Sequence, residues 1–137
     1  MREPPDTDFG VSFDAVSERF AANVYGTDKG RLRLDLLRED LQLPPVVAMR
    51  ASPGDVLDAG CGAAPLSLAW ALEGHRVTLV ELSARMLELA RAAYTRAGVA
   101  EGARFRLGPL QQLLPDLATD FRFIFLHAVL EWTPEPR

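Results

Sequence analysis

Residues 55–64 read DVLDAGCGAA, an apolar strand pattern that runs into two glycines separated by one cysteine. Glycine adopts backbone angles that other residues rarely reach, so Gly60 and Gly62 predict a sharp turn from a strand into a helix. A turn of this kind lets a ligand approach the backbone closely, and amides at a helix start favour anionic groups. We therefore expect the fold and the functional site to be organised around this turn.

The sequence around the turn alternates between strand and helix patterns. Strands are predicted at Val56–Ala59, Arg76–Val80, Ala103–Leu107 and Phe121–Leu126. Helices are predicted at Pro65–Glu73, from a Ser83 cap to Gly98, and near Leu110–Leu114. The first of these helices is apolar nearly all round, so we expect it to be largely buried. The alternation predicts an α/β fold, a Rossmann-like parallel sheet, with ligands at the carboxyl ends of its strands. We expect the strand order 3-2-1-4.

Before the strands, the sequence predicts a tail and two N-terminal helices. Residues 1–10 hold prolines and aspartates with few apolar groups, which is typical of a flexible tail, so the domain is expected to span residues 11–137. Phe13, Val16, Phe20 and Val24 recur at helical spacing. A second helix is expected from Thr27 or Asp28 to Leu41, where Pro44-Pro45 would stop it, and residues 46–54 are expected to form a connector.

The composition is that of one globular domain. The chain has 137 residues, of which 48% are hydrophobic and 25% charged, with a net charge of −4. No apolar run suits a membrane span and no signal peptide is visible, so we expect a cytoplasmic protein without a membrane partner. One cysteine and two histidines leave no ligand set for an internal disulfide or a closed zinc site. The acidic balance predicts no general nucleic-acid surface, although an RNA substrate held locally remains open.

A carboxylate at the end of the second strand completes the candidate site. Glu81 lies 21 positions after Gly60, where it can accept hydrogen bonds from both ribose hydroxyls of a nucleoside. Pro65 stands where a dinucleotide fingerprint carries its third glycine, which disfavours a nicotinamide cofactor. The turn and Glu81 together favour an adenosyl cofactor. The alternative is an unrelated strand–helix turn beside a solvated glutamate.

The run Asp58-Ala-Gly-Cys-Gly62 followed by Glu81 resembles the class I S-adenosylmethionine-dependent methyltransferases. Three further blocks resemble the tRNA 5-carboxymethoxyuridine methyltransferase family: FAANVYGTDKG at residues 20–30 with Leu32-Arg33, ELSARM at residues 81–86, and LHAVLEW at residues 126–132. The resemblance covers about residues 13–137, the N-terminal part of a methyltransferase domain. It implies S-adenosylmethionine as cofactor, tRNA as substrate, and methyl transfer to the carboxylate of 5-carboxymethoxyuridine at the wobble position.

The resemblance also implies which residues line the cofactor pocket: Arg33, Gly60, Cys61, Glu81, Leu110, Gln111 and His127. Arg33 would bind the methionine carboxylate, and Leu110 with Gln111 would contact the adenine edge. Cys61 would contribute its backbone rather than its thiol, and His127 would face the crevice from the fourth strand. No catalytic residue is assigned, because the acceptor carboxylate is ionised at neutral pH and needs only positioning.

This chain departs from the family pattern in sequence and in length. Ala64 stands where motif one usually carries a third glycine, and Gln112 stands where an acidic residue is usual, so both are expected to weaken cofactor binding. The family is about twice as long. We therefore expect most substrate contacts to be missing and the isolated chain to be inactive on tRNA.

The length also predicts exposed apolar surface and leaves two alternative functions open. The fourth strand, with Leu130 and Trp132 after it, is expected to be uncovered and prone to self-association. One alternative is a class I methyltransferase that acts on a small molecule, for example a quinone precursor. The other is a truncated, non-catalytic remnant that binds the cofactor weakly or assembles with another polypeptide.

Overall fold

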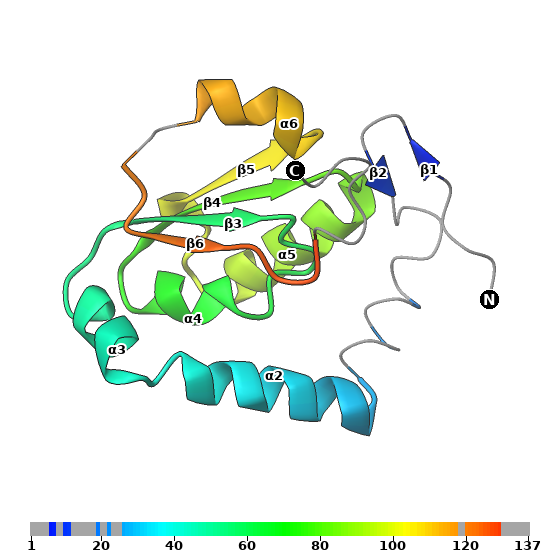
Figure 1. Cartoon of the computed structure of the whole chain (residues 1–137). Coiled ribbons are helices and arrows are strands. Elements are labelled where there is room, and N and C mark those ends of the chain that lie inside the picture. The colour runs from blue at the N-terminus through cyan, green and yellow to red at the C-terminus, as the bar shows by residue number, and fades with distance from the viewer. Residues whose placement is uncertain are drawn as a thin grey trace.

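The computed structural model describes residues 6–7, 10–11, 19, 22, 26–117 and 120–129 of the chain. Its largest feature is a parallel sheet of β3 (Asp55–Ala59), β4 (Arg76–Glu81), β5 (Ala103–Leu107) and β6 (Phe123–Phe125). The strands lie in the order β5-β4-β3-β6 (Figure 1), which confirms the predicted order 3-2-1-4 and the Rossmann-like α/β class. The last strand is shorter than the predicted Phe121–Leu126.

The register of the sheet brings the strand ends together. Ala59 at the end of β3 pairs with Val80, and Glu81 at the end of β4 pairs with Leu107 of β5. Because the strands are parallel, their carboxyl ends meet at one edge of the sheet. The glycine turn leaves β3 at this edge.

Helices flank the sheet on both faces. On one face lie α4 (Ser67–Leu72) and α5 (Ala84–Arg96), and on the other lies α6 (Leu110–Leu113) (Figure 1). Before β3 the chain forms α2 (Asp28–Asp40) and α3 (Pro44–Arg50), which contribute side chains to the core beside α4. Two 3-10 turns, η1 (Ala100–Gly102) and η2 (Leu114–Asp116), precede β5 and follow α6.

Local sequence signals explain the two longest helices. The Thr27 hydroxyl accepts a hydrogen bond from the Gly30 amide at the start of α2, and the Ser83 hydroxyl accepts one from the Met86 amide at the start of α5. After α5, Gly98 has a φ of 74°, a left-handed conformation that favours glycine. The predicted inward face of α5 is confirmed, because the residues expected there are all buried: Met86, Leu87, Ala90 and Tyr94.

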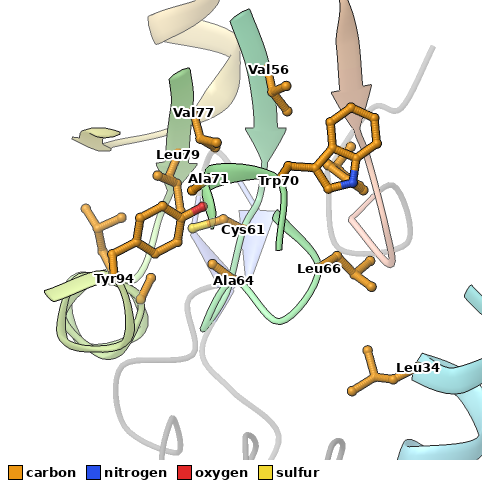
Figure 2. Close-up of a cluster of buried hydrophobic side chains, with 13 residues drawn as sticks. Leu34, Val56, Cys61, Ala64, Leu66, Trp70, Ala71, Val77, Leu79 and Tyr94 are labelled. Atoms are coloured by element: carbon orange, nitrogen blue, oxygen red, sulfur yellow. The ribbon is translucent and has the colours of Figure 1, made fainter. Parts of the chain in front are cut away.

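The larger core cluster lies between the sheet and the α4–α5 layer. Figure 2 shows Trp70, Cys61, Leu79 and Tyr94 within it, and the Trp70 and Tyr94 residues are completely enclosed. The Trp70 ring lies 4.5 Å from the Phe123 ring, centroid to centroid, so β6 is held to α4 by aromatic contact. Burial of these large side chains removes apolar area from water and stabilises the fold.

Two predictions about the helices are wrong. Pro44-Pro45 was expected to end a helix and begin a connector, but α3 begins at Pro44, because proline fits the first turn of a helix, where backbone amides have no partner. The Pro65–Glu73 helix is shorter, at Ser67–Leu72, and only one side of it is buried: Leu72 is 60% exposed. Its exposed side turns away from the sheet.

Some predictions fall mostly outside the described residues. The predicted helix of Phe13 to Val24 is one, and Leu130 and Trp132 are others. Within residues 1–10, Asp6–Thr7 pairs with Gly10–Val11 as the antiparallel strands β1 and β2, and the flexibility of the tail stays a prediction.

Candidate functional site

The turn after β3 is shaped by three residues in left-handed backbone conformations. The φ angles of Gly60, Gly62 and Ala64 are 71°, 53° and 57°. The amides of Gly60 and Cys61 both donate to the carbonyl of Val80, at 2.8 and 3.0 Å. These bonds tie the turn to the end of β4, so its backbone is held open at the edge of the sheet.

Ala64 shows why a third glycine is usual at its position. Its φ of 57° places its Cβ close to its own backbone, which costs about 1 kcal/mol in a residue other than glycine. The side chain is buried at 1% exposure and belongs to the larger core cluster. The methyl group therefore gains apolar contacts that offset part of the conformational cost.

Glu81 is fixed by the turn itself. Its two carboxylate oxygens accept hydrogen bonds from the Gly62 amide at 2.8 Å and from the Ser83 amide at 2.9 Å. The residue is buried at 9% exposure. A carboxylate accepts hydrogen bonds through both of its oxygens, so these two bonds orient the group at the turn. Sequence reasoning assigned Glu81 to ribose and missed that it also holds the turn.

A buried hydrogen-bond chain behind the turn was also missed. The Ser67 hydroxyl donates to Asp58 Oδ2 at 2.5 Å, and the Tyr94 hydroxyl donates to Ser67 Oγ at 3.0 Å. Burial raises the pKa of the Asp58 carboxyl from its usual 3.8 to about 7, a rise that the Ser67 bond opposes and the negative charge of Glu81 increases. The available signal was Ser67, a hydroxyl in an otherwise apolar helix.

Cys61 lies inside the protein rather than in a reactive position. It is 4% exposed, and its thiol donates to the Gly62 carbonyl at 3.3 Å. Burial raises the pKa of the thiol, and the nearby carboxylates of Asp58 and Glu81 raise it further. The thiol therefore stays protonated, and only the backbone of Cys61 is available to a ligand at neutral pH.

The structure brings several of the predicted residues to the same edge and leaves one apart. Leu110 and Gln111 begin α6 just after β5, where the Gly108 amide donates to the Glu81 carbonyl at 2.9 Å. His127 follows β6 and is half-buried, and a Cβ on Gly60 would lie 2.5 Å from Val129 Cγ2. Both segments thus leave the sheet at its carboxyl edge. Arg33 is exposed on α2 and forms no ion pair with any other described residue.

Other kinds of site are not formed by the described residues. No three His, Cys, Asp or Glu side chains among them gather as metal ligands. None of the described helices is both long and apolar enough to cross a bilayer. A cavity of about 360 Å³ opens between α2, α3 and α4, where Arg50 lies over the Trp70 ring, but none of the seven predicted site residues lines it.

Comparison with known proteins identifies relatives along the chain. Residues 56–137 match the family model described as a methyltransferase domain. The tRNA 5-carboxymethoxyuridine methyltransferase of Escherichia coli K12 is 38% identical over 126 residues, which cover 92% of this chain and 48% of the relative. The malonyl-[acyl-carrier protein] O-methyltransferase of Serratia marcescens is 38% identical over 82 residues, covering 58% of this chain and 29% of the relative.

The solved structure of the bifunctional kinase-methyltransferase WbdD has the same fold. It is 23% identical with a TM-score of 0.59 and covers 96% of this chain and 27% of its own. At this identity the likeness concerns the fold alone. The chain spans about half the length, or less, of the curated relatives it matches.

Proposed function

The chain belongs to the methyltransferase domain family, and from that premise we propose that it provides the cofactor site of an S-adenosylmethionine-dependent tRNA methyltransferase. The proposed reaction is methyl transfer to the carboxylate of 5-carboxymethoxyuridine at the wobble position. The support for this acceptor is the identity of 38% over 92% of the chain to the Escherichia coli enzyme. A tRNA substrate also supports a cytoplasmic location.

The geometry that carries the proposal is the carboxylate of Glu81 beside the glycine turn. The Gly62 and Ser83 amides hold this carboxylate at the turn, and a carboxylate in this position suits the two hydroxyls of a ribose. The left-handed conformations of Gly60 and Gly62 place the backbone of the turn at the same edge. These residues fit an adenosyl group, with the adenine expected near Leu110 and Gln111 and the methionine carboxylate near Arg33.

The proposed chemistry asks little of the protein beyond positioning. S-adenosylmethionine, when bound, supplies an electrophilic methyl group on a positively charged sulfur. The acceptor carboxylate is already ionised at neutral pH, so no general base is required. Holding the two reactants in line contributes roughly 7–11 kcal/mol through proximity and orientation. We therefore assign cofactor-binding residues and no catalytic residue.

A small-molecule acceptor is the second candidate. It is supported by the match to the ubiquinone biosynthesis O-methyltransferase of Bordetella avium, which is 33% identical over 81 residues and covers 59% of the chain against 92% for the tRNA enzyme. The wider alignment includes α2, which carries Arg33, and favours tRNA. The chain alone is expected to be inactive on tRNA, so the two candidates are separated with a full-length family form. Its methyl transfer from labelled S-adenosylmethionine is measured to tRNA with and without carboxymethoxyuridine and to small carboxylic acids. A full-length form that binds the cofactor and transfers no methyl group to any acceptor would support the non-catalytic alternative.

The cofactor site is tested first by binding. Calorimetry with S-adenosylmethionine should show Glu81→Gln binding at least about tenfold more weakly than the parent chain, because a charged acceptor of two hydrogen bonds is lost. Glu88→Gln is the matched control, since Glu88 is exposed on α5 and pairs with Arg85. Absence of binding by the folded parent chain would refute the proposal.

Arg33 needs a separate test, because its role rests on the family alone. Arg33→Ala should weaken S-adenosylmethionine binding by about tenfold or more if its guanidinium binds the methionine carboxylate. Arg31→Ala is the control, because Arg31 is exposed on the same helix and pairs with Asp28. Equal affinities of the two variants would make Arg33 an ordinary surface residue.

A further inference from the structure

Three polar side chains from three different elements meet inside the apolar core. Asp58 comes from β3, Ser67 is the first residue of α4, and Tyr94 lies near the end of α5. Tyr94 donates to Ser67 and Ser67 donates to Asp58, so the hydroxyls form a relay that ends on the carboxyl. In Figure 2 the Tyr94 side chain extends from α5 toward the labelled residues of α4.

The three residues of the relay are not equally buried. Ser67 and Tyr94 are 0% exposed, whereas Asp58 retains 6% exposure. Asp58 lies two residues before Gly60, at the start of the turn. The relay is therefore enclosed in the core, and its carboxyl end lies next to the turn. Enclosed polar groups cost free energy unless each has a partner, so a relay this deep fixes the geometry of the carboxyl at its end.

The surroundings leave Asp58 sensitive to protonation. Glu81 on β4 is the charged neighbour that acts on it, while the turn contributes the Cys61 thiol and β6 contributes the apolar ring of Phe125. Burial also raises the pKa of the Tyr94 hydroxyl, so it remains a donor at neutral pH. With a pKa of about 7, the Asp58 carboxyl changes charge in the neutral range.

We propose that Ser67 and Tyr94 are positioning residues for the cofactor turn: their hydroxyls hold the Asp58 carboxyl and set the pH range in which the turn binds the cationic cofactor. The inference rests on the proposed function and deepens it. S-adenosylmethionine carries a positive sulfonium and ammonium and one carboxylate, so its net charge is positive. An ionised Asp58 at the turn attracts this charge, and a protonated Asp58 does not.

The experiment follows two readouts across a range of about pH 5.5 to 8.5. Carbon NMR of the Asp58 carboxyl gives its titration midpoint in the chain without cofactor, and calorimetry gives S-adenosylmethionine affinity at each pH. In the parent chain we expect affinity to fall roughly tenfold per pH unit below the midpoint, because one proton is linked to binding.

Ser67→Ala should raise both midpoints by about one pH unit, since a hydrogen bond to the charged form is lost. Tyr94→Phe should raise both by less, because it removes only the bond that polarises Ser67.

Thr95→Val is the matched control. It removes a hydroxyl from the next position of α5, one that is exposed and donates to the Arg91 carbonyl, and it should leave both midpoints unchanged. Affinity that is independent of pH, or that does not follow the NMR midpoint across the variants, would overturn the inference while leaving the proposed function intact. A folded chain that binds no S-adenosylmethionine at any pH would refute the proposed function, and this inference with it.

Discussion

The two faces of the sheet are covered very differently. The face toward α4 and α5 packs against the larger core cluster, which includes Trp70 and Tyr94. On the face toward α6, the buried cluster of the described chain consists of Leu57, Ala59 and Val80. On that second face Ile124, which alternates with Phe123 and Phe125 along β6, is 55% exposed.

This difference separates the part of the molecule that holds the site from the part that does not. Asp58 alternates along β3 with the buried Val56, and Glu81 alternates along β4 with Leu79, so both carboxyls share the well-covered face. The packing that stabilises the sheet thus also fixes the groups behind the turn. The face toward α6 contributes little to the stability of the sheet or to the position of these groups.

The largest loss of stability is expected when a large side chain is removed from the face toward α4 and α5. Trp70→Ala removes an enclosed ring that contacts His75, Phe123 and Phe125, and should lower the free energy of unfolding by about 4 kcal/mol. Leu57→Ala on the face toward α6 should lower the free energy of unfolding by about 2 kcal/mol, because fewer neighbours surround the cavity it leaves. Urea unfolding of both variants measures the difference. Equal losses would mean that the two faces contribute equally to stability.

A smaller effect concerns pH, and it should differ in sign between two aspartates of β3. Burial raises the folded-state pKa of Asp58 to about 7, so its contribution to stability is fully present below about pH 4 and is lost as the pH rises through about 7. Asp58→Asn removes this titration. Its free energy of unfolding should therefore rise by about 2 kcal/mol relative to that of the parent chain between about pH 4 and about pH 7.

Asp55 provides the opposite case. Its hydrogen bond from Arg76 lowers its pKa, so its contribution is present above its usual pKa of 3.8 and is lost as the pH falls. The pair is largely exposed, so Asp55→Asn should change stability by at most a few tenths of a kcal/mol. Urea unfolding from about pH 2 to 8 tests both variants. A parallel pH response of the two would contradict the assigned causes.

The smallest effect on stability is expected at the exposed position of β6. Ile124→Thr keeps a β-branched side chain and should change the free energy of unfolding by less than about 0.5 kcal/mol. It should nevertheless reduce self-association, because an exposed apolar edge strand invites pairing with another chain. Light scattering against protein concentration measures this. Unchanged scattering would show that β6 is not the surface through which chains associate.

Much of the fold follows from residue pattern because each signal acts locally. Ser83 and Gly98 bound α5 since a side-chain cap and a left-handed backbone are needed at those ends, and the apolar residues between them face the sheet. Strand order follows from the right-handed crossovers of parallel strands. The start of α3 was not predicted, because Pro44 both stops one helix and fits the first turn of the next.

The site was predictable in position but not in its connections. Gly60, Cys61 and Glu81 are brought together as expected, because the turn and a neighbouring strand end must meet at one edge. The role of Tyr94 could not be inferred, since an aromatic residue at helical spacing predicts only a core position and its hydroxyl partner lies 27 positions away. The role of Arg33 rests on the family resemblance and stays a prediction.

The bonds that shape the turn also make its geometry depend on a neighbouring strand. Gly60 and Cys61 donate to Val80, and Gly62 donates to Glu81, 19 positions further along the chain. None of these bonds can form until β4 lies in register beside β3. The binding turn is therefore completed within one strand–helix–strand unit, β3–α4–β4, and none of these bonds uses a residue of β5 or β6.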